Sequence, residues 1–571
     1  SLTLSAGYRR YLGLGQFLAV GLGGRIRLDS PAPEAAPRDA APASPVTPQP
    51  LTSPTRPLTE ASRAAPLRIT DLTFTEVFPV FFKYYDEHPV GSFRVSNTTS
   101  EPIEDLTITF RAGRYMDNPT TCRVEDDIGP VETEEAEVLA FFNESVLDIT
   151  ESTKVSAEIA ISFVHNEQRH NQTYTHTVRL HDRNSMTWDD SRKPAAFVTA
   201  RDPSVMTLSK LISGVTSEGP PSPVPGPLRT AMALHAAVSH YGMSYTPDPE
   251  SPLRDRDDAS HAIDYIQFPR QTLEYRGGDC DDLSILYAAL FQALGIETAF
   301  ILVPGHVFLA FDLGLGPEEA RRQLPRAEEL IFRDGRTWIP VETTALDMSF
   351  LEAWQTGARQ WREASAREQA EILATSECWE VYEPVGLLGQ GQPLTLPAGE
   401  DVYTTYHREL TSFIDQAIFP MVARIRERAR ESENPLPYRN RLAVLYGRYG
   451  LYDRARTELE AILREEPDYA PAIINLANIH LIHDEPQNAL ARYEEALELD
   501  PDNPRVMLSI AKINHARENY GIATRMLDRA KQIDPVLAAR FSYIEMRGAE
   551  STRASQGESP GESILWEETD E

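Results

Sequence analysis

Cysteine is scarce in this sequence, with three residues, Cys122, Cys280 and Cys378, in a chain of 571. Three cysteines cannot build a disulfide framework, and an odd number leaves at least one thiol unpaired within the chain. The disulfide state of Cys122 and Cys378, and the cellular compartment, therefore stay open at this level. A lone cysteine usually packs as a small apolar residue, so only its neighbours can indicate a nucleophile.

Positive charge is also low, because 55 lysines and arginines face 86 acidic residues and the net charge is -31. A nucleic acid or a basic membrane-surface patch would need clustered Lys and Arg, so we expect neither kind of interaction. No stretch reaches the ~18 apolar residues of a membrane-spanning helix. Glycine-rich phosphate loops, Cys-x-x-Cys pairs and His-Glu-x-x-His are missing, so we expect no nucleotide, metal or other cofactor.

The length predicts several domains, since one domain takes roughly 150 residues. The apolar fraction of 41% is sufficient for real cores. Local patterns predict a multidomain protein in which an all-β part, an α+β part and an all-α part follow one another. We predict a β-hairpin over 1–28, a Pro/Ala-rich linker over 29–66, a β-sandwich over 67–190, an α+β domain over 200–400, a helical domain over 401–548 and a disordered acidic tail over 549–571.

The first 28 residues contain two alternating segments around Gly13–Gly15. Their glycine and aromatic content resembles the closing strands of an outer-membrane barrel. A signal peptide is the competing interpretation, but Arg25 and Arg27 follow the apolar stretch and no small-residue cleavage site is present. Because the chain begins with Ser1, we expect a missing upstream part and, through it, association with the outer membrane. The linker that follows is too rich in Pro, Ala, Ser and Thr to bury much surface.

Short apolar runs alternate with turn signals from residue 67 to about residue 185. This spacing is typical of an antiparallel β-sandwich of immunoglobulin-like kind. No catalytic constellation is visible there, so a spacer or recognition role is expected. The runs are Leu67–Thr70, Val90–Val95, Leu106–Phe110, Ala157–Phe163 and Thr173–Leu180.

The segment Tyr275–Asp282 reads Tyr-Arg-Gly-Gly-Asp-Cys-Asp-Asp, and His306 and Glu342 follow it. A cysteine nucleophile needs a base to take its proton and an acceptor to orient that base, and these residue types supply all three roles. Apolar residues recur at helical spacing after Cys280, which places the thiol at a helix N-terminus. The helix dipole there favours a thiolate, whereas flanking Asp279, Asp281 and Asp282 oppose it unless they are paired or turned away.

Three strands are predicted after this helix. The first covers 296–303, the second begins at His306 after a Pro-Gly bend, and the third covers 337–342 after an Asp-Gly turn. His306 then opens one strand and Glu342 lies near the end of another. A helix and neighbouring strands in this order can bring Cys280, His306 and Glu342 together as a catalytic site.

At these residues the chain resembles the bacterial transglutaminase-like superfamily, a papain-related α+β fold. The resemblance covers roughly residues 225 to 365. It implies a nucleophilic Cys280, a general base His306 and an orienting acid Glu342. The sequence departs from the family pattern where Glu replaces the commoner Asp and where Val-Phe rather than Ala-Trp follows the histidine. The resemblance is carried by Gly278–Leu286, Gly295-Ile296, Pro304–Phe308 and Trp338–Thr344.

Beyond residue 400 the sequence repeats with a period of 34 residues. The spacing resembles the tetratricopeptide signature over 434–535, in which small residues let paired helices approach and proline ends each unit. Three units and a capping helix near 537–548 would form a solenoid that binds a peptide or protein partner; a spacer or dimer surface is the alternative. The periodic sets are Pro467, Pro501 and Pro535; Ala443, Ala477 and Ala511; and Ala455, Ala489 and Ala523.

The leading hypothesis is a bacterial, cell-envelope thiol enzyme, placed in the periplasm, that acts on a peptide or protein substrate. Peptide hydrolysis, amide hydrolysis and transglutaminase crosslinking would all pass through a thioester on Cys280. A noncatalytic scaffold or protein-binding pseudoenzyme is the second hypothesis, and an assembly protein tethered to the outer membrane is the third. Cytoplasmic residence is the alternative location.

Overall fold

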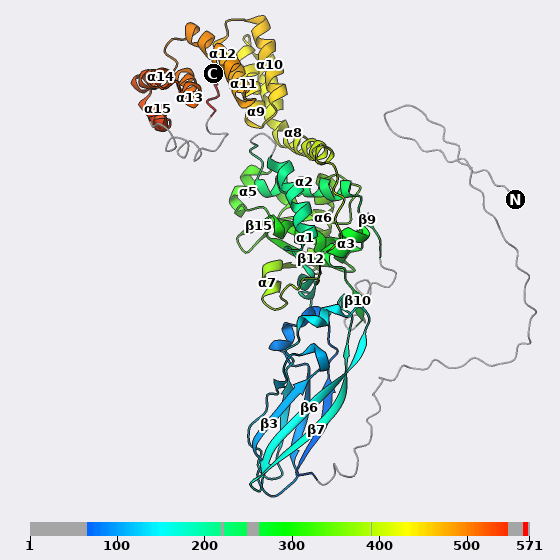
Figure 1. Ribbon diagram of the computed structural model, residues 1–571. Helices are drawn as coiled ribbons and strands as arrows, with labels where there is room; N and C mark the ends of the chain where they lie inside the picture. Colours follow the sequence, from blue (N-terminus) through cyan, green and yellow to red (C-terminus); the bar gives the residue numbers. More distant parts are fainter. Residues whose placement is uncertain (1–64, 218–221, 248–261, 390, 546–563, 569–571) are drawn as a thin grey trace, which may run out of the picture. The chain divides into compact units, whose positions relative to one another are not determined.

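The computed structural model describes residues 65–217, 222–247, 262–389, 391–545 and 564–568. These residues form a multidomain α+β architecture whose C-terminal region is helical (Figure 1). The hairpin predicted over 1–28 and nearly all of the linker predicted over 29–66 lie outside the described residues. Within the described residues, none of the helices is both long enough and apolar enough to cross a bilayer.

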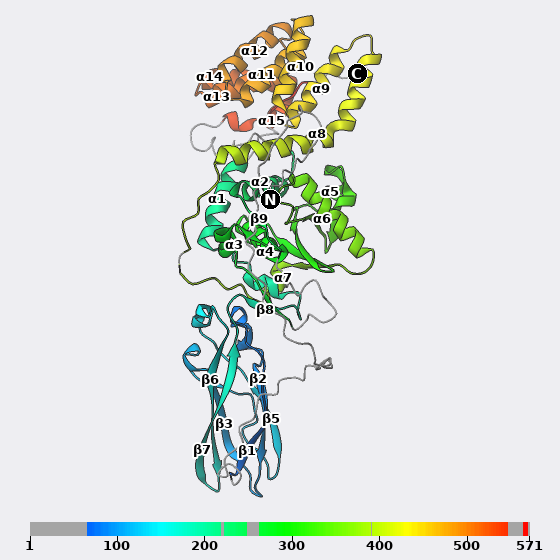
Figure 2. The same cartoon turned by 90° about the vertical axis from the view of Figure 1, so that its right-hand side faces the viewer.

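The N-terminal region contains two antiparallel sheets, in the orders β1-β2-β5 and β4-β3-β6-β7 (Figure 2). Side chains alternate along β6, so that Ala157, Ile159, Ile161 and Phe163 are buried. Four of the five predicted strand segments fall within strands, and the segment 90–95 begins one residue early, because β2 starts at Gly91. The strands are β1 (Leu67–Phe74), β2 (Gly91–Asn97), β3 (Glu104–Arg111), β4 (Thr120–Thr121), β5 (Thr133–Val138), β6 (Thr153–His165) and β7 (Gln168–Leu180).

The central region is built on a five-stranded antiparallel sheet in the order β14-β15-β13-β12-β16. Two short ladders, β8 with β10 and β9 with β11, accompany this sheet. Among the described residues, seven α-helices are interspersed with the strands. They are β8 (Ser185–Thr187), α1 (Pro203–Ser217), α2 (Gly226–Tyr241), β9 (Ser244–Tyr245), β10 (Ile263–Tyr265), α3 (Pro269–Tyr275), β11 (Gly277–Gly278), α4 (Cys280–Ala293), β12 (Thr298–Val303), β13 (His306–Asp312), α5 (Pro317–Gln323), β14 (Ile331–Arg333), β15 (Arg336–Val341), α6 (Phe350–Ser365), β16 (Glu371–Ala374) and α7 (Thr375–Trp379).

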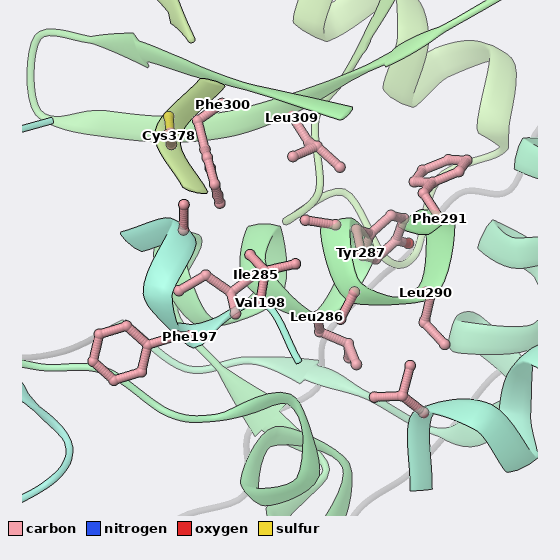
Figure 3. Close-up of a cluster of buried hydrophobic side chains, with 14 of the residues drawn as sticks. Phe197, Val198, Ile285, Leu286, Tyr287, Leu290, Phe291, Phe300, Leu309 and Cys378 are labelled. Carbon is pink, nitrogen blue, oxygen red and sulfur yellow. The ribbon is translucent and has the colours of Figure 1, made fainter. Parts of the chain in front are cut away.

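Helix α4 packs against one face of this sheet. Figure 3 shows Phe300 of β12 and Leu309 of β13 on the side of the sheet that faces α4, and Tyr287 and Phe291 of α4 belong to the same apolar cluster. The opposite face forms a second apolar cluster that includes residues of α6. Because both faces are covered, all six residues of β12 are buried, and after Thr298 its sequence is continuously apolar rather than alternating. The sheet is therefore a rigid support for the loops at its ends.

The C-terminal region begins with a long helix and continues with three helix pairs, α9 with α10, α11 with α12 and α13 with α14. Small residues at the 34-residue period, such as Ala443, Ala477 and Ala511, are fully buried where the helices meet. The helices are α8 (Gly399–Glu431), α9 (Leu436–Arg448), α10 (Tyr452–Glu465), α11 (Ala470–Ile482), α12 (Pro486–Leu499), α13 (Pro504–Ala516), α14 (Tyr520–Ile533) and α15 (Pro535–Ala539).

Two expectations for the end of the chain need correction. The capping helix predicted near 537–548 is instead the short α15 followed by a 3-10 turn over Ser542–Glu545. The tail predicted to be disordered over 549–571 contains residues 564–568, whose Leu565 and Trp566 are buried against the helical region. Composition averaged over the acidic tail concealed these apolar side chains, which supply the surface needed for packing.

Candidate active site

Cys280 is the first residue of α4, as the helical spacing predicted. Asp279 caps the helix, because its carboxylate accepts hydrogen bonds from the backbone N–H groups of Asp281 and Asp282. The Asp282 carboxylate accepts from the Asp279 N–H in return, at 3.3 Å. Gly278 permits this tight approach, since a Cβ there would lie 2.5 Å from the Cβ of Asp282. The glycine pair and the cap together fix the position of the thiol.

His306 is placed by the hairpin between β12 and β13. Val303 pairs with His306 in the ladder, so only Pro304 and Gly305 form the turn. Gly305 has a φ of +71°, a left-handed conformation that glycine adopts at little cost, while proline favours the position before it. The imidazole is thereby fixed at the start of β13, one residue beyond the turn.

Glu342 directly follows β15 and orients His306. Its Oε2 lies 2.8 Å from His306 Nε2. Its Oε1 accepts hydrogen bonds from Thr344, at 2.6 Å from the hydroxyl and 3.0 Å from the backbone N–H. Helix α6 backs this segment closely, since a Cβ on Gly357 would lie 3.1 Å from the Glu342 nitrogen. With Nε2 bound to Glu342, Nδ1 is the ring nitrogen left for Cys280.

The electrostatics favour a protonated histidine. Burial lowers the pKa of His306, but contact with the Cys280 thiol and the hydrogen bond to Glu342 raise it to about 10. Burial raises the pKa of Glu342, but the hydrogen bond and charge of His306 hold that pKa below its usual range. The His306 imidazolium therefore stabilises the fold fully below pH 6.5, and this stabilisation is lost as pH rises through about 10. The Glu342 carboxylate stabilises the fold above pH 4.5, and this stabilisation is lost as pH falls.

The acidic residues beside Cys280 carry less charge than the sequence suggested. Burial, and then the charge of Asp279, raise the pKa of Asp282 to about 8. Burial and the adjacent Asp279 raise the pKa of Asp281 well above its usual range. The Asp282 carboxyl group is therefore mainly protonated at neutral pH, and the raised pKa of Asp281 also favours its neutral form. Their opposition to a Cys280 thiolate is correspondingly reduced.

The same three aspartates are the acidic group among the described residues best placed to hold a cation. Ligand oxygens of Asp279, Asp281 and Asp282 lie within 4.8 Å of one another. Asp279 accepts from backbone N–H groups of the first helical turn, and Asp282 accepts from the backbone N–H groups of Asp279 and Gln267. Asp281 accepts from the Asp282 N–H at 2.7 Å. We therefore assign the cluster to helix capping.

Cys280, His306 and Glu342 line one pocket of about 570 Å³. As the first residue of α4, Cys280 has a backbone N–H without an intrahelical acceptor, so this group can bind an oxyanion. The sequence did not predict the two hydrogen bonds from Thr344 to Glu342, although this threonine follows Glu342 by two residues. It also missed polar residues with no motif around them, which reach the pocket from β9 and α6: Tyr245, Thr356 and Gln360.

The other two cysteines are placed differently. Cys122 and Cys378 are free thiols buried in the apolar core, and Figure 3 shows Cys378 near Phe300. Burial raises the pKa of each thiol to about 12. Neither lines the pocket of Cys280.

Comparison with known proteins gives no relative, because no family model matches the chain and no curated protein matches it either. The function must therefore be argued from the residues of the pocket.

Proposed function

We propose that this protein is a thiol-dependent enzyme of the transglutaminase-like, papain-related class that acts on peptide or carboxamide bonds. The supporting observation is that Cys280, His306 and Glu342 line one pocket, with the His306–Glu342 hydrogen bond at 2.8 Å. Nucleophile, base and orienting acid reach this pocket from a helix and two sheet strands. Cysteine peptidase or amidase activity and transglutaminase activity all fit this arrangement.

The reaction would begin with attack of the Cys280 thiolate on the substrate carbonyl carbon. A C–S bond forms, and the Cys280 N–H at the start of α4 stabilises the oxyanion. His306 then donates its proton to the leaving nitrogen, the C–N bond breaks and an amine departs, which leaves a thioester. Water or an acceptor amine gives a proton to His306 and attacks the thioester, so that Cys280 leaves as thiolate. We favour water as the acceptor.

The flanking regions would serve recognition. We propose an immunoglobulin-like sandwich at the N-terminal side and a tetratricopeptide solenoid that binds a protein partner. The coincidence of the 34-residue period with the helix pairs supports the solenoid. A bacterial cell-envelope location, in the periplasm, is proposed on the resemblance of residues 1–28 to barrel strands.

Selective alkylation tests the proposed nucleophile. In the native chain at pH 7, we expect iodoacetamide to modify Cys280 at least about tenfold faster than Cys122 or Cys378, because burial holds the pKa of both other thiols near 12. Peptide mapping by mass spectrometry measures the three rates in one sample. After unfolding in guanidinium, all three sites should react alike. Equal rates in the native chain, or preferential reaction at Cys122 or Cys378, would contradict the proposal.

A further inference from the structure

The helical region binds the chain's own residues Ile564–Glu568. The backbone of this segment is held by two asparagines on α11. Asn475 Nδ2 donates to the carbonyl of Glu567 at 2.8 Å, and Asn475 Oδ1 accepts the Glu567 N–H at 2.8 Å. Asn478 Nδ2 donates to the carbonyl of Leu565 at 3.0 Å. The segment therefore makes main-chain contacts of the kind that bind an extended peptide.

Three buried asparagines form a hydrogen-bonded network that holds the segment. Asn440 on α9 donates to the same Glu567 carbonyl at 2.9 Å, and its Oδ1 accepts a hydrogen bond from Asn475. Asn440, Asn475 and Asn478 are fully buried. Buried amides that lack partners are costly, so the bound peptide backbone completes a network that an empty groove would leave to water.

A tryptophan pocket gives the groove side-chain selectivity. Trp566 is buried against α9, and a Cβ on Gly447 would overlap its ring. Glycine inside a helix costs about 1 kcal/mol relative to alanine. Its presence in α9 is explained by the space that the indole ring requires. Leu565, on the other side of the segment, joins the apolar cluster of α13, α14 and α15.

Positive charge complements the glutamates that follow the tryptophan. Arg505 of α13 donates to the Trp566 carbonyl at 2.6 Å and lies 3.7 Å from the Glu567 carboxylate. Arg448 of α9 lies 2.8 Å from the Glu568 carboxylate. A neighbouring pocket of about 360 Å³ also contains Glu568 and is lined by four arginines: Arg424, Arg428, Arg441 and Arg448.

We propose that this groove is a receptor for extended peptides in which an apolar residue and a tryptophan precede acidic residues, and that Ile564–Glu568 occupies it as an intramolecular ligand. An external partner with the same chemistry must displace this segment. A tethered ligand reaches an effective concentration in the millimolar range, so it competes strongly with a free peptide. The inference rests on the proposed peptide-binding role of the helical region and not on the thiol chemistry.

The test uses a fluorescent peptide of residues 563–569, Ser-Ile-Leu-Trp-Glu-Glu-Thr, and fluorescence anisotropy. The Trp566→Ala chain should bind this peptide at least about tenfold more tightly than the wild-type chain, because its own segment no longer competes. Adding Gly447→Ala to that chain should remove binding, since the methyl group fills the indole site while alanine retains the helix. A peptide with alanine in place of tryptophan should bind none of the chains.

Three results would overturn the inference. One is a peptide affinity that is the same in the wild-type and Trp566→Ala chains. Another is tight binding of the tryptophan-free peptide. The third is concentration-dependent dimerisation of the wild-type chain that Trp566→Ala abolishes, because the segment would then bind a second copy. Binding is measured independently of Cys280 reactivity, so either proposal can fail while the other stands.

Discussion

Replacing His306 by alanine is expected to slow the alkylation of Cys280 by iodoacetamide at pH 6 about a hundredfold. Burial lowers the pKa of His306, but its contacts with Cys280 and Glu342 raise that pKa to about 10. The proposed mechanism requires that the resulting imidazolium stabilises the thiolate. A thiol without such a partner has a pKa of about 8.5, so only roughly 0.3% of it is ionised at pH 6. The variant should therefore react at about the rate of a simple thiol.

The pH dependence distinguishes this effect from a change in access. The difference between the two chains should shrink as pH rises past about 8.5, because an unpaired thiol then ionises on its own. His240→Ala is the matched control, since this histidine is exposed on α2 and lies outside the pocket. A ratio that stays constant from pH 6 to pH 9, or equal rates throughout, would show that His306 does not activate the thiol.

Glu342→Gln is expected to reduce the turnover of p-nitrophenyl acetate by at least about a hundredfold. Thr344 donates two hydrogen bonds to Glu342 Oε1, so the glutamine must turn its carbonyl oxygen toward Thr344 and its NH₂ group toward His306. His306 Nε2 must then accept a hydrogen bond, which leaves the imidazole proton on Nδ1. A neutral ring in that tautomer cannot take the proton of Cys280.

The matched control for this substitution is Glu352→Gln. Glu352 is exposed in the first turn of α6, and its carboxylate accepts a hydrogen bond from the backbone N–H of the N-cap residue Ser349 at 3.0 Å, a role that the glutamine oxygen also fills. Ester turnover should stay near the wild-type rate in Glu352→Gln, and thermal unfolding should show that both variants are folded. Full turnover in folded Glu342→Gln would remove Glu342 from the proposed mechanism.

The sequence predicted those features of the site that depend on local pattern. Helical spacing after Cys280, the Pro304-Gly305 bend and the Asp334-Gly335 turn correctly placed α4, β13 and β15. Both residues of the latter turn have positive φ, as the tight hairpin between β14 and β15 requires. Such turns and periodicities are set by neighbouring residues, so they can be recognised without knowledge of the fold.

Features set by distant contacts were not predictable. The pKa of Asp282 is raised mainly by burial within the folded domain, and no local sequence pattern indicates this burial. The ordered segment 564–568 depends on Asn475, 92 residues before Glu567. The short pairings of β8 with β10 and of β9 with β11 also join residues distant in sequence. Only the folded chain brings these groups together.

The central claim is that Cys280 forms a thioester, and acyl trapping tests it most directly. The native chain is mixed with p-nitrophenyl acetate, quenched in acid after the release of p-nitrophenolate, and mapped by mass spectrometry. The account predicts a burst of about one equivalent with a single acetyl group on Cys280, and neither burst nor acetylation at that position in the Cys280→Ala chain. The absence of a burst, or a burst that persists in Cys280→Ala, would contradict the account.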